Sequence, residues 1–242
     1  MIITSKSNPI IKTVSSLSDK KFRKQLGLYL VEGIKPVKES ISAGCEIERI
    51  ICTIENESDF SGATVVSDGV FKSISSEKTP QGVIAVVKIP KRELKPPKSS
   101  CLLLDCLQDP GNLGTVIRTA NAAGYGEIYL INCTDPYSPK AVRASMSGIF
   151  FVNLYSGTRE EILKTLENVP IICADMQGEN VFEFVPPEKF CLCIGNEGGG
   201  ISEEVFGQAS HTVKIPMRES CESLNAAVSA GIAMYALKNN IK

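Results

Sequence analysis

The chain has 242 residues, 43% of them hydrophobic, and its 26 Lys and Arg residues nearly balance its 27 Asp and Glu residues. This length and apolar content suffice for one large or two modest cores, which excludes an intrinsically disordered protein. Because no run of about 18 apolar residues occurs and residues 1–12 lack a continuous apolar segment, we expect a cytoplasmic protein without a membrane span or signal peptide.

The first part of the chain predicts a small α/β domain. Residues 28–33 (LYLVEG), 47–54 (IERIICTI) and 81–89 (QGVIAVVKI) have the short apolar pattern of strands, and residues 33–44 read as a helix. The next stretch, IPKRELKPPKSS, places three prolines among charged residues, which neither a helix nor a central strand accommodates. We therefore expect a domain boundary near residue 95.

Residues 95–242 predict a larger α/β domain. Apolar segments alternate with helical ones, which indicates a parallel sheet covered by helices on both faces. The predicted strands are 101–107, 127–132, 149–155, 170–175, 190–196 and 211–216. The predicted helices are 112–124, 139–147, 158–168 and 222–239.

Charge differs between the two predicted domains. Residues 1–98 carry a net charge of +5 and the remainder −6. A basic N-terminal domain fits an RNA-binding module, since phosphate contacts dominate nucleic-acid affinity, although a solvated surface explains the asymmetry equally well. The candidate RNA-binding residues are Lys20, Lys21, Arg23 and Lys24.

The nine cysteines are interpreted as packing residues. Most lie in apolar strand-like runs such as CLLLDC and FCLCIG, where a thiol behaves as a small hydrophobe. Cys191 and Cys193 alternate across a strand, and the single histidine, His211, lies far along the chain. We therefore expect no disulfide and no metal site.

A glycine-containing turn follows the strand at 101–107. The stretch QDPGNLGTVIRTANAAG, residues 108–124, contains neither the G-x-G-x-x-G pattern of dinucleotide-binding folds nor a P-loop. An oxidoreductase or transferase with an ordinary nucleotide site is therefore not supported. On a helical wheel Arg118 points roughly 140° away from Leu113 on the apolar stripe, so we expect an exposed arginine.

Two more turns follow predicted strands, at the sheet edge where open parallel sheets place their ligands. IGNEGGGIS, residues 194–202, has three consecutive glycines, which permit close approach of backbone to a ligand or simply a tight turn. IPMRESCESLNAAVSAGIAMY, residues 215–235, starts a helix of small residues with Glu222, Ser223 and Asn225 near its N-terminus. Ser223 or Asn225 could bind a ligand or cap that helix.

Together these three stretches resemble the three signature motifs of the SpoU (TrmH) family of RNA ribose 2′-O-methyltransferases. NLGTVIR matches the first motif, GNEGGGIS the second, and IPM followed by ESLNAAVSAGI the third. Glu219 departs from the pattern, since many members have glycine after IPM. The N-terminal stretches ITSKSNPIIK, KFRKQLGLYLVEG and TPQGVIAVV are similar to the substrate-binding domain of the family's rRNA methyltransferases.

The resemblance implies a SPOUT-type trefoil knot in the second domain, S-adenosylmethionine as cofactor, and a homodimer. It also implies domains 1–94 for RNA binding and 95–242 for catalysis. The implied cofactor-binding residues are Gly195, Asn196, Ile215, Met217 and Leu224. The implied catalytic residues are Asn112, Arg118, Glu197, Ser223 and Asn225, with Arg118 reaching the partner subunit's site.

The function implied is methylation of a ribose 2′-hydroxyl in structured RNA, with 23S rRNA as the expected substrate. The same chemistry on tRNA and a non-catalytic RNA-binding homologue are the alternatives. A guanidinium keeps its proton at ordinary pH, so we expect Arg118 to orient a phosphate and stabilise negative charge on the oxygen. The proton would then pass to Glu197, water or a phosphate oxygen.

Overall fold

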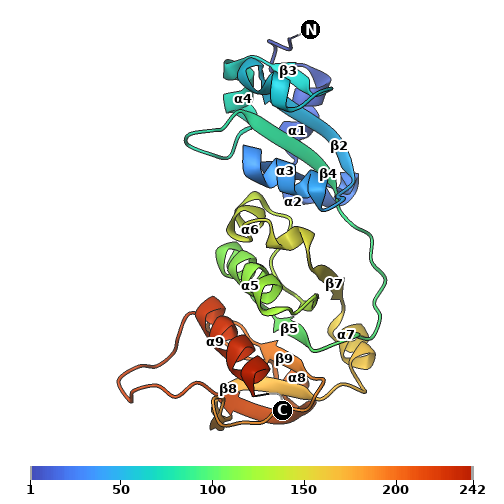
Figure 1. The fold of residues 1–242 in the computed structure, drawn as a ribbon. Helices are drawn as coiled ribbons and strands as arrows, with labels where there is room; N and C mark the ends of the chain where they lie inside the picture. The colour runs from blue at the N-terminus through green and yellow to red at the C-terminus, as the bar shows by residue number, and fades with distance from the viewer. Residues whose placement is uncertain (1, 241–242) are drawn as a thin grey trace. The chain divides into compact units, whose positions relative to one another are not determined.

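The computed structural model describes residues 2–240, which form two compact units (Figure 1). One unit takes the chain up to Lys91 together with Asp135–Phe150, and the other takes Arg92–Thr134 together with the chain from Phe151 onward. No helix within residues 2–240 is long and apolar enough to cross a lipid bilayer.

The first unit contains a mixed four-stranded sheet. Its strands are β1 (Leu28–Glu32), β2 (Ile47–Thr53), β3 (Thr64–Val66) and β4 (Val83–Lys88). Their order is β1-β4-β2-β3, with β4 antiparallel to β1 and β2, and β3 parallel to β2. The three predicted strands are confirmed. The short β3 was not predicted, because three residues carry too little pattern to be recognised.

Helices cover this sheet and close the first core. They are α1 (Pro9–Ser16), α2 (Lys20–Leu26), α3 (Ile34–Ser42), η1 (Ile54–Asp59) and α4 (Asp68–Ile74), joined by α6 (Pro139–Ala144) and η2 (Gly148–Phe150) from the later segment. Ile11 of α1 and Phe71 of α4 pack with Ile51 and Ile84 of the sheet. Helix α1 starts at Pro9 because Asn8 accepts a hydrogen bond from the Ile10 amide, at 2.9 Å.

The second unit is built on a parallel six-stranded sheet. Its strands are β5 (Cys101–Asp105), β6 (Glu127–Ile131), β7 (Asn153–Gly157), β8 (Ile171–Asn180), β9 (Cys191–Ile194) and β10 (Ala209–Lys214). Their order is β10-β8-β9-β5-β6-β7, and every neighbouring pair is parallel. The predicted parallel sheet is confirmed. The strand predicted over 149–155 begins later, since residues 148–150 form the 3₁₀ turn η2.

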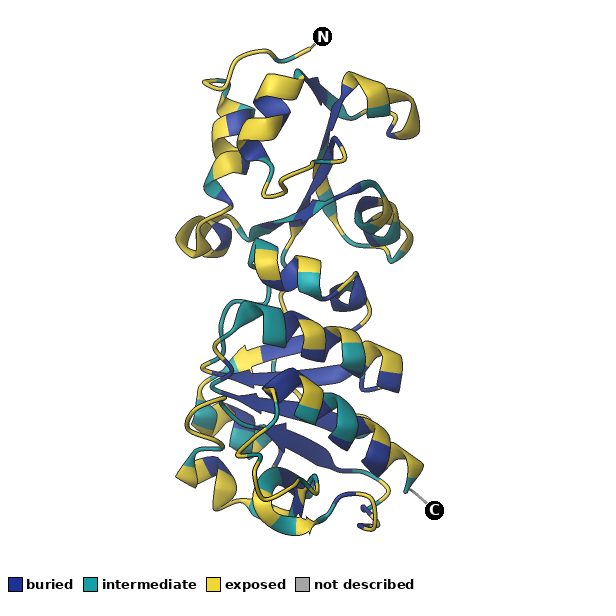
Figure 2. Cartoon of the chain, turned by 90° about the vertical axis from the view of Figure 1, so that its left-hand side faces the viewer, coloured by how far each residue is buried: buried dark blue, intermediate teal, exposed yellow. Residues whose placement is uncertain are grey.

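Helices lie on both faces of this sheet, as predicted (Figure 1). They are α5 (Pro110–Ala123), α7 (Arg159–Thr165), α8 (Glu203–Phe206) and α9 (Ala226–Asn239). On one face Ile162 of α7 and Val205 of α8 complete a core around Leu103. On the other face α5 and α9 pack together, and the Tyr125 hydroxyl after α5 donates to the Met234 carbonyl of α9. Burial is concentrated in the strands, while exposed residues line the outer helix faces (Figure 2). The trefoil knot stays a prediction.

Four cysteines form part of the core on the Leu103 face: Cys101, Cys173, Cys191 and Cys193. Cys101 stands opposite Cys191 and Cys173 opposite Cys193 in the register of the parallel strands. All nine cysteines are free thiols. Burial raises the pKa of the Cys191 and Cys193 thiols well above the ordinary value, so both remain protonated at neutral pH.

Candidate functional site

Three segments that are distant in sequence meet at the carboxyl-terminal edge of the parallel sheet. Asn112, in the first turn of α5, donates from Nδ2 to Oε1 of Glu197 at 2.8 Å. Asn225, immediately before α9, donates from Nδ2 to Oδ1 of Asn112 at 2.9 Å. The structure therefore brings together three of the five predicted catalytic residues in one hydrogen-bonded chain.

Asn112 is oriented by the start of its own helix. The Asp109 carboxylate caps α5 and accepts a hydrogen bond from the Asn112 backbone amide at 2.8 Å, and Pro110 occupies the first helical position. Because the cap satisfies the backbone amide, the Asn112 side chain is available for Glu197 and Asn225. This turn therefore starts a helix and presents the side-chain amide of Asn112. It is not a phosphate-binding loop.

Glu197 lies at the tip of a tight turn formed by residues 195–200. The backbone groups of Asn196 and Gly200 exchange two hydrogen bonds, at 2.8 and 3.1 Å. The Asn196 side-chain oxygen also accepts from the amides of Gly198 (2.8 Å) and Gly199 (3.0 Å). Gly195 is required here by close approach, since an added Cβ would come within 2.3 Å of the Gly200 carbonyl carbon.

Asn225 combines both roles that its sequence position suggested. Its Oδ1 caps α9 by accepting from the amides of Ala227 (2.9 Å) and Val228 (3.3 Å), while its Nδ2 reaches Asn112. The helix predicted over 222–239 therefore begins at Ala226. Residues 221–225 approach it as irregular backbone that leads Asn225 to the network.

A cavity lies beside β8, the end of β10 and the residues that follow these strands. Three of the five predicted cofactor-binding residues, Ile215, Met217 and Leu224, line it together with Ser223. Its other lining residues are Ala174, Asp175, Met176, Val181, Val213, Lys214, Ser229 and Ala233. Apolar walls with a few polar groups suit an adenine ring and a bent sulfonium-containing chain, so the residues present fit the implied cofactor. Gly195 and Asn196 do not line this cavity and instead shape the turn below Glu197.

Arg118 lies on the exposed side of α5, as the helical wheel predicted. Its neighbours Leu113, Ile117 and Ala120 are fully buried. Within residues 2–240, the Arg118 side chain has no hydrogen bond or ion pair, and it is not part of the network of Asn112, Glu197 and Asn225. The part of the chain that the structure describes also contains no group of three or more His, Cys, Asp or Glu side chains suited to a metal.

The predicted RNA-binding cluster in α2 divides into exposed and buried members. Lys20, Lys21 and Lys24 are exposed. Arg23 is only 3% exposed and pairs with Asp135 at 2.7 Å, while its guanidinium also donates to the carbonyls of Leu17 and Ser18. The assignment of Arg23 to an RNA-contacting surface was therefore wrong, because its charge is neutralised inside the first unit.

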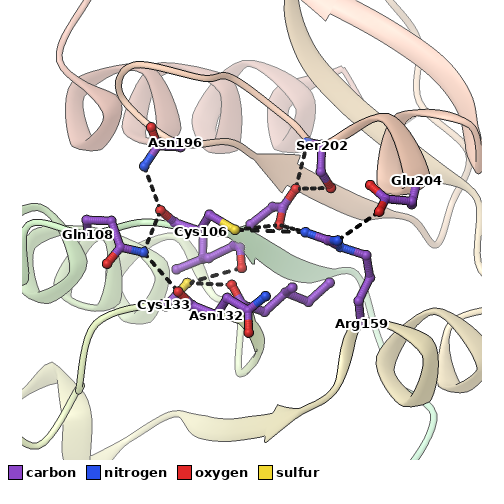
Figure 3. A network of polar contacts seen from close by, with 11 residues as sticks. Cys106, Gln108, Asn132, Cys133, Arg159, Asn196, Ser202 and Glu204 are labelled. Atoms are coloured by element: carbon purple, nitrogen blue, oxygen red, sulfur yellow. Dashed lines mark hydrogen bonds and ion pairs between the residues drawn. The ribbon is translucent and has the colours of Figure 1, made fainter.

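Sequence reasoning missed a second polar network behind the glycine turn (Figure 3). Asp105, the last residue of β5, is 0% exposed and accepts hydrogen bonds from Ser202. Cys106 follows with a positive φ of 60°, and its carbonyl accepts from Asn196 at 2.7 Å. An aspartate ending an otherwise apolar strand was the only signal in the sequence.

Comparisons with known proteins agree with this geometry. Residues 99–235 match the SpoU rRNA Methylase family, and residues 8–85 match the MRM3-like substrate binding domain. The chain is 30% identical over 245 residues to the 23S rRNA (guanosine(2553)-2′-O)-methyltransferase of Bacillus subtilis, covering 98% of each chain. It also resembles the AdoMet-bound rRNA methyltransferase of Sinorhizobium meliloti (TM-score 0.91, 27% identity, 100% and 98% of the two chains). A TrmH-family RNA methyltransferase structure from Porphyromonas gingivalis is similar as well (TM-score 0.87, 32% identity, 96% and 98% coverage).

Proposed function

Because the chain belongs to the SpoU rRNA methylase family, we propose that it transfers a methyl group from S-adenosylmethionine to a ribose 2′-hydroxyl of 23S rRNA. The observation that carries this proposal is the chain of hydrogen bonds from Asn225 through Asn112 to Glu197. All three family motifs contribute one residue each to it. Relatives that span both parts of the chain include proteins named as rRNA methyltransferases.

Ile215, Met217 and Leu224 hold the cofactor in the cavity beside β10. When bound, S-adenosylmethionine supplies an electrophilic methyl group on a sulfonium centre. Ser223 shares the cavity with these apolar residues and therefore lies where it can orient the ribose or the polar end of the cofactor. Gly195 and Asn196 keep the neighbouring turn compact.

A neutral 2′-hydroxyl is a weak nucleophile, so the protein must help to remove its proton. Glu197 is the one carboxylate in the hydrogen-bonded set, and Asn112 donates to only one of its oxygens at short distance. Its other oxygen, Oε2, has only a long hydrogen bond from Asn196 Nδ2, at 3.5 Å, and accepts the proton. Arg118 orients an RNA phosphate and stabilises charge on the attacking oxygen.

Arg118 acts in the active site of the second subunit of a homodimer. Its exposed position on α5, without a partner among the described residues of its own chain, supports this role. Mixing subunits carrying Arg118→Ala with subunits carrying Glu197→Gln tests it. Each parent is expected to lose at least about 100-fold in rate, and the mixture to regain up to a quarter of wild-type activity, because one of the two sites in each mixed dimer is intact. No recovery after verified subunit exchange would contradict the role in the partner's site.

The N-terminal unit binds the RNA, with Lys20, Lys21 and Lys24 contacting phosphates. Their exposure and the match of residues 8–85 to a substrate-binding domain support this assignment. Reversing the three charges with Glu should raise the RNA dissociation constant and reduce the slope of its logarithm against log salt by about 3, one for each lost phosphate contact. An unchanged slope would remove these lysines from the interface.

The function is tested by deleting the gene and mapping ribose methylation in total RNA. The expected result is loss of one 2′-O-methyl group from 23S rRNA, restored by wild type but not by Glu197→Gln. Purified protein should also bind S-adenosylmethionine in calorimetry. Loss of a tRNA methyl group instead would move the substrate to tRNA, and failure to bind S-adenosylmethionine would favour a non-catalytic RNA-binding protein.

A further inference from the structure

The carboxylate of Asp105 is buried at the point where β5 ends. Its Oδ2 accepts two hydrogen bonds from Ser202, from the backbone amide at 2.8 Å and from the hydroxyl at 2.6 Å. Its Oδ1 lies 3.5 Å from Nη2 of Arg159 and accepts from the Cys106 thiol at 3.3 Å. Figure 3 displays these contacts as one connected group.

The Ser202 hydroxyl does not make the hydrogen bond that is usual for its position in the chain. It stands at the N-cap of α8, where a serine hydroxyl ordinarily accepts from a backbone amide of the first turn. No such side-chain cap bond is present at Ser202. The hydroxyl donates instead to Asp105, so the chain gives up a local helix cap for a contact with a strand 97 positions earlier.

The residue after Asp105 holds the other end of the same turn. Cys106 adopts a left-handed backbone conformation, with φ of 60°, which is unfavourable for a residue other than glycine. In this conformation its carbonyl accepts from Asn196 at 2.7 Å and from Gln108 at 3.0 Å. Asp105, the last residue of β5, and Cys106, which follows it, thus bind the chain on both sides of Glu197, at Ser202 just after the turn and at Asn196 near its start.

We propose that Asp105 is a positioning residue for methyl transfer. It fixes the position and direction of Glu197 relative to Asn112 by anchoring the turn through Ser202. This inference rests on the proposed function. Glu197 itself is exposed and lies between the two anchors, so its position relative to Asn112 depends on where the anchors hold the backbone. Arg159 balances the buried charge of Asp105 and is itself paired with Glu204 at 3.1 Å.

Variants of Ser202 separate positioning from folding. Ser202→Ala removes the hydrogen bond from the hydroxyl to the Asp105 carboxylate but keeps the one from the backbone amide. Ser202→Thr keeps the hydroxyl as well. We expect Ser202→Ala to lower kcat by about tenfold, the effect of losing one charge-assisted hydrogen bond, and Ser202→Thr to restore most of it. The dissociation constant for S-adenosylmethionine should change by less than about threefold, because neither Ser202 nor Asp105 lines the cavity of Ile215 and Leu224.

A double-mutant cycle tests whether Asp105 and Ser202 act through each other. Asp105→Asn alone should lower kcat by about ten- to thirtyfold, and the double variant should be no slower than this single variant by more than about twofold. Glu127→Gln is the matched control. Glu127 is also a buried carboxylate of this sheet, and it accepts a backbone amide bond from Lys98 at 2.7 Å. It lies at the amino end of β6, so its variant should keep kcat.

Amide hydrogen exchange supplies a readout that does not depend on activity. Exchange at residues 196–200 should rise about tenfold in Ser202→Ala and stay unchanged in Glu127→Gln, while β5 stays protected in both. Faster exchange with an unchanged kcat would overturn the positioning role, and so would additive effects in the cycle. If the wild-type protein failed to methylate any RNA, the proposed function would fall, whereas the exchange data would still report whether Asp105 anchors the turn.

Discussion

The side-chain amide of Asn225 donates to the side-chain oxygen of Asn112, a residue 113 positions earlier. Asn112 passes the connection on by donating to Glu197. An amide is the one side-chain group of this size that accepts on one side and donates on the other. The network therefore depends on the chemistry of Asn112 as much as on its location.

Replacing Asn112 by Asp keeps the size and the acceptor but removes the donor. The new carboxylate would face Glu197 at hydrogen-bonding distance, and the repulsion should displace Glu197. We expect kcat for methyl transfer to fall by about 100-fold, measured in single-turnover assays with labelled S-adenosylmethionine.

Asn121→Asp is the control for this change, because Asn121 is an exposed residue of the same helix. It introduces the same charge on α5 away from Glu197 and should leave kcat within about twofold. Equal losses in the two variants would mean that the charge of the helix matters and the contact with Glu197 does not.

Gly195 and Gly198 belong to the same turn but should respond oppositely to alanine. The Cβ of Gly195→Ala would overlap the Gly200 backbone at 2.3 Å, so the turn must open and stability should fall by about 1–3 kcal/mol. The Cβ of Gly198→Ala meets only the Asn196 side-chain oxygen, at 3.6 Å. Urea unfolding and methyl-transfer rates should be near wild type for Gly198→Ala, and equal effects would argue against the observed packing.

Arg23 should behave as a structural residue, unlike its lysine neighbours. Arg23→Met leaves Asp135 without its cation inside the first unit, which typically costs about 3–5 kcal/mol. Lys21→Met changes an exposed side chain of the same helix and should alter stability by less than about 0.5 kcal/mol. Thermal unfolding measures both, and a stable Arg23→Met protein would contradict the importance of the buried pair.

Alkaline pH should destabilise the protein partly through Cys133. Burial raises the pKa of this thiol from 9.0 to about 12, so above pH 9 the unfolded chain releases a proton that the native state retains. The free energy of unfolding should therefore be unaffected by this group below pH 9 and fall by up to about 1.4 kcal/mol for each further pH unit towards 12. Between pH 8 and pH 10, the urea midpoint should fall less for Cys133→Ala than for wild type. Equal falls in the two proteins would refute the raised pKa of Cys133.

The strands and helices of the parallel sheet were readable from sequence because their apolar runs are continuous and separated by turn residues. The exposed face of α5 was equally readable, since a helical wheel needs only local spacing. In the first unit, α1 and α4 were not predicted. Both are short, and they pack against Ile51 and Ile84, which lie outside any local sequence window. The last helix was predicted to begin too early because Asn225, three residues after the predicted start, provides the cap.

The candidate site was predictable in its members but not in its connections. Asn112, Glu197 and Asn225 came from motif resemblance, whereas the order of their hydrogen bonds depends on three loops meeting in space. Arg23 resembled its neighbouring lysines in sequence, and its burial and its ion pair with the distant Asp135 distinguish it. Asp105 escaped notice for a similar reason, since its partner Ser202 lies on another loop.

The buried cysteines of the parallel sheet offer a way to follow its opening. Cys101, Cys173, Cys191 and Cys193 are fully buried in the central strands, so a thiol reagent reaches them only when those strands separate. The rate of thiol labelling therefore measures the rate at which the central strands of the sheet open.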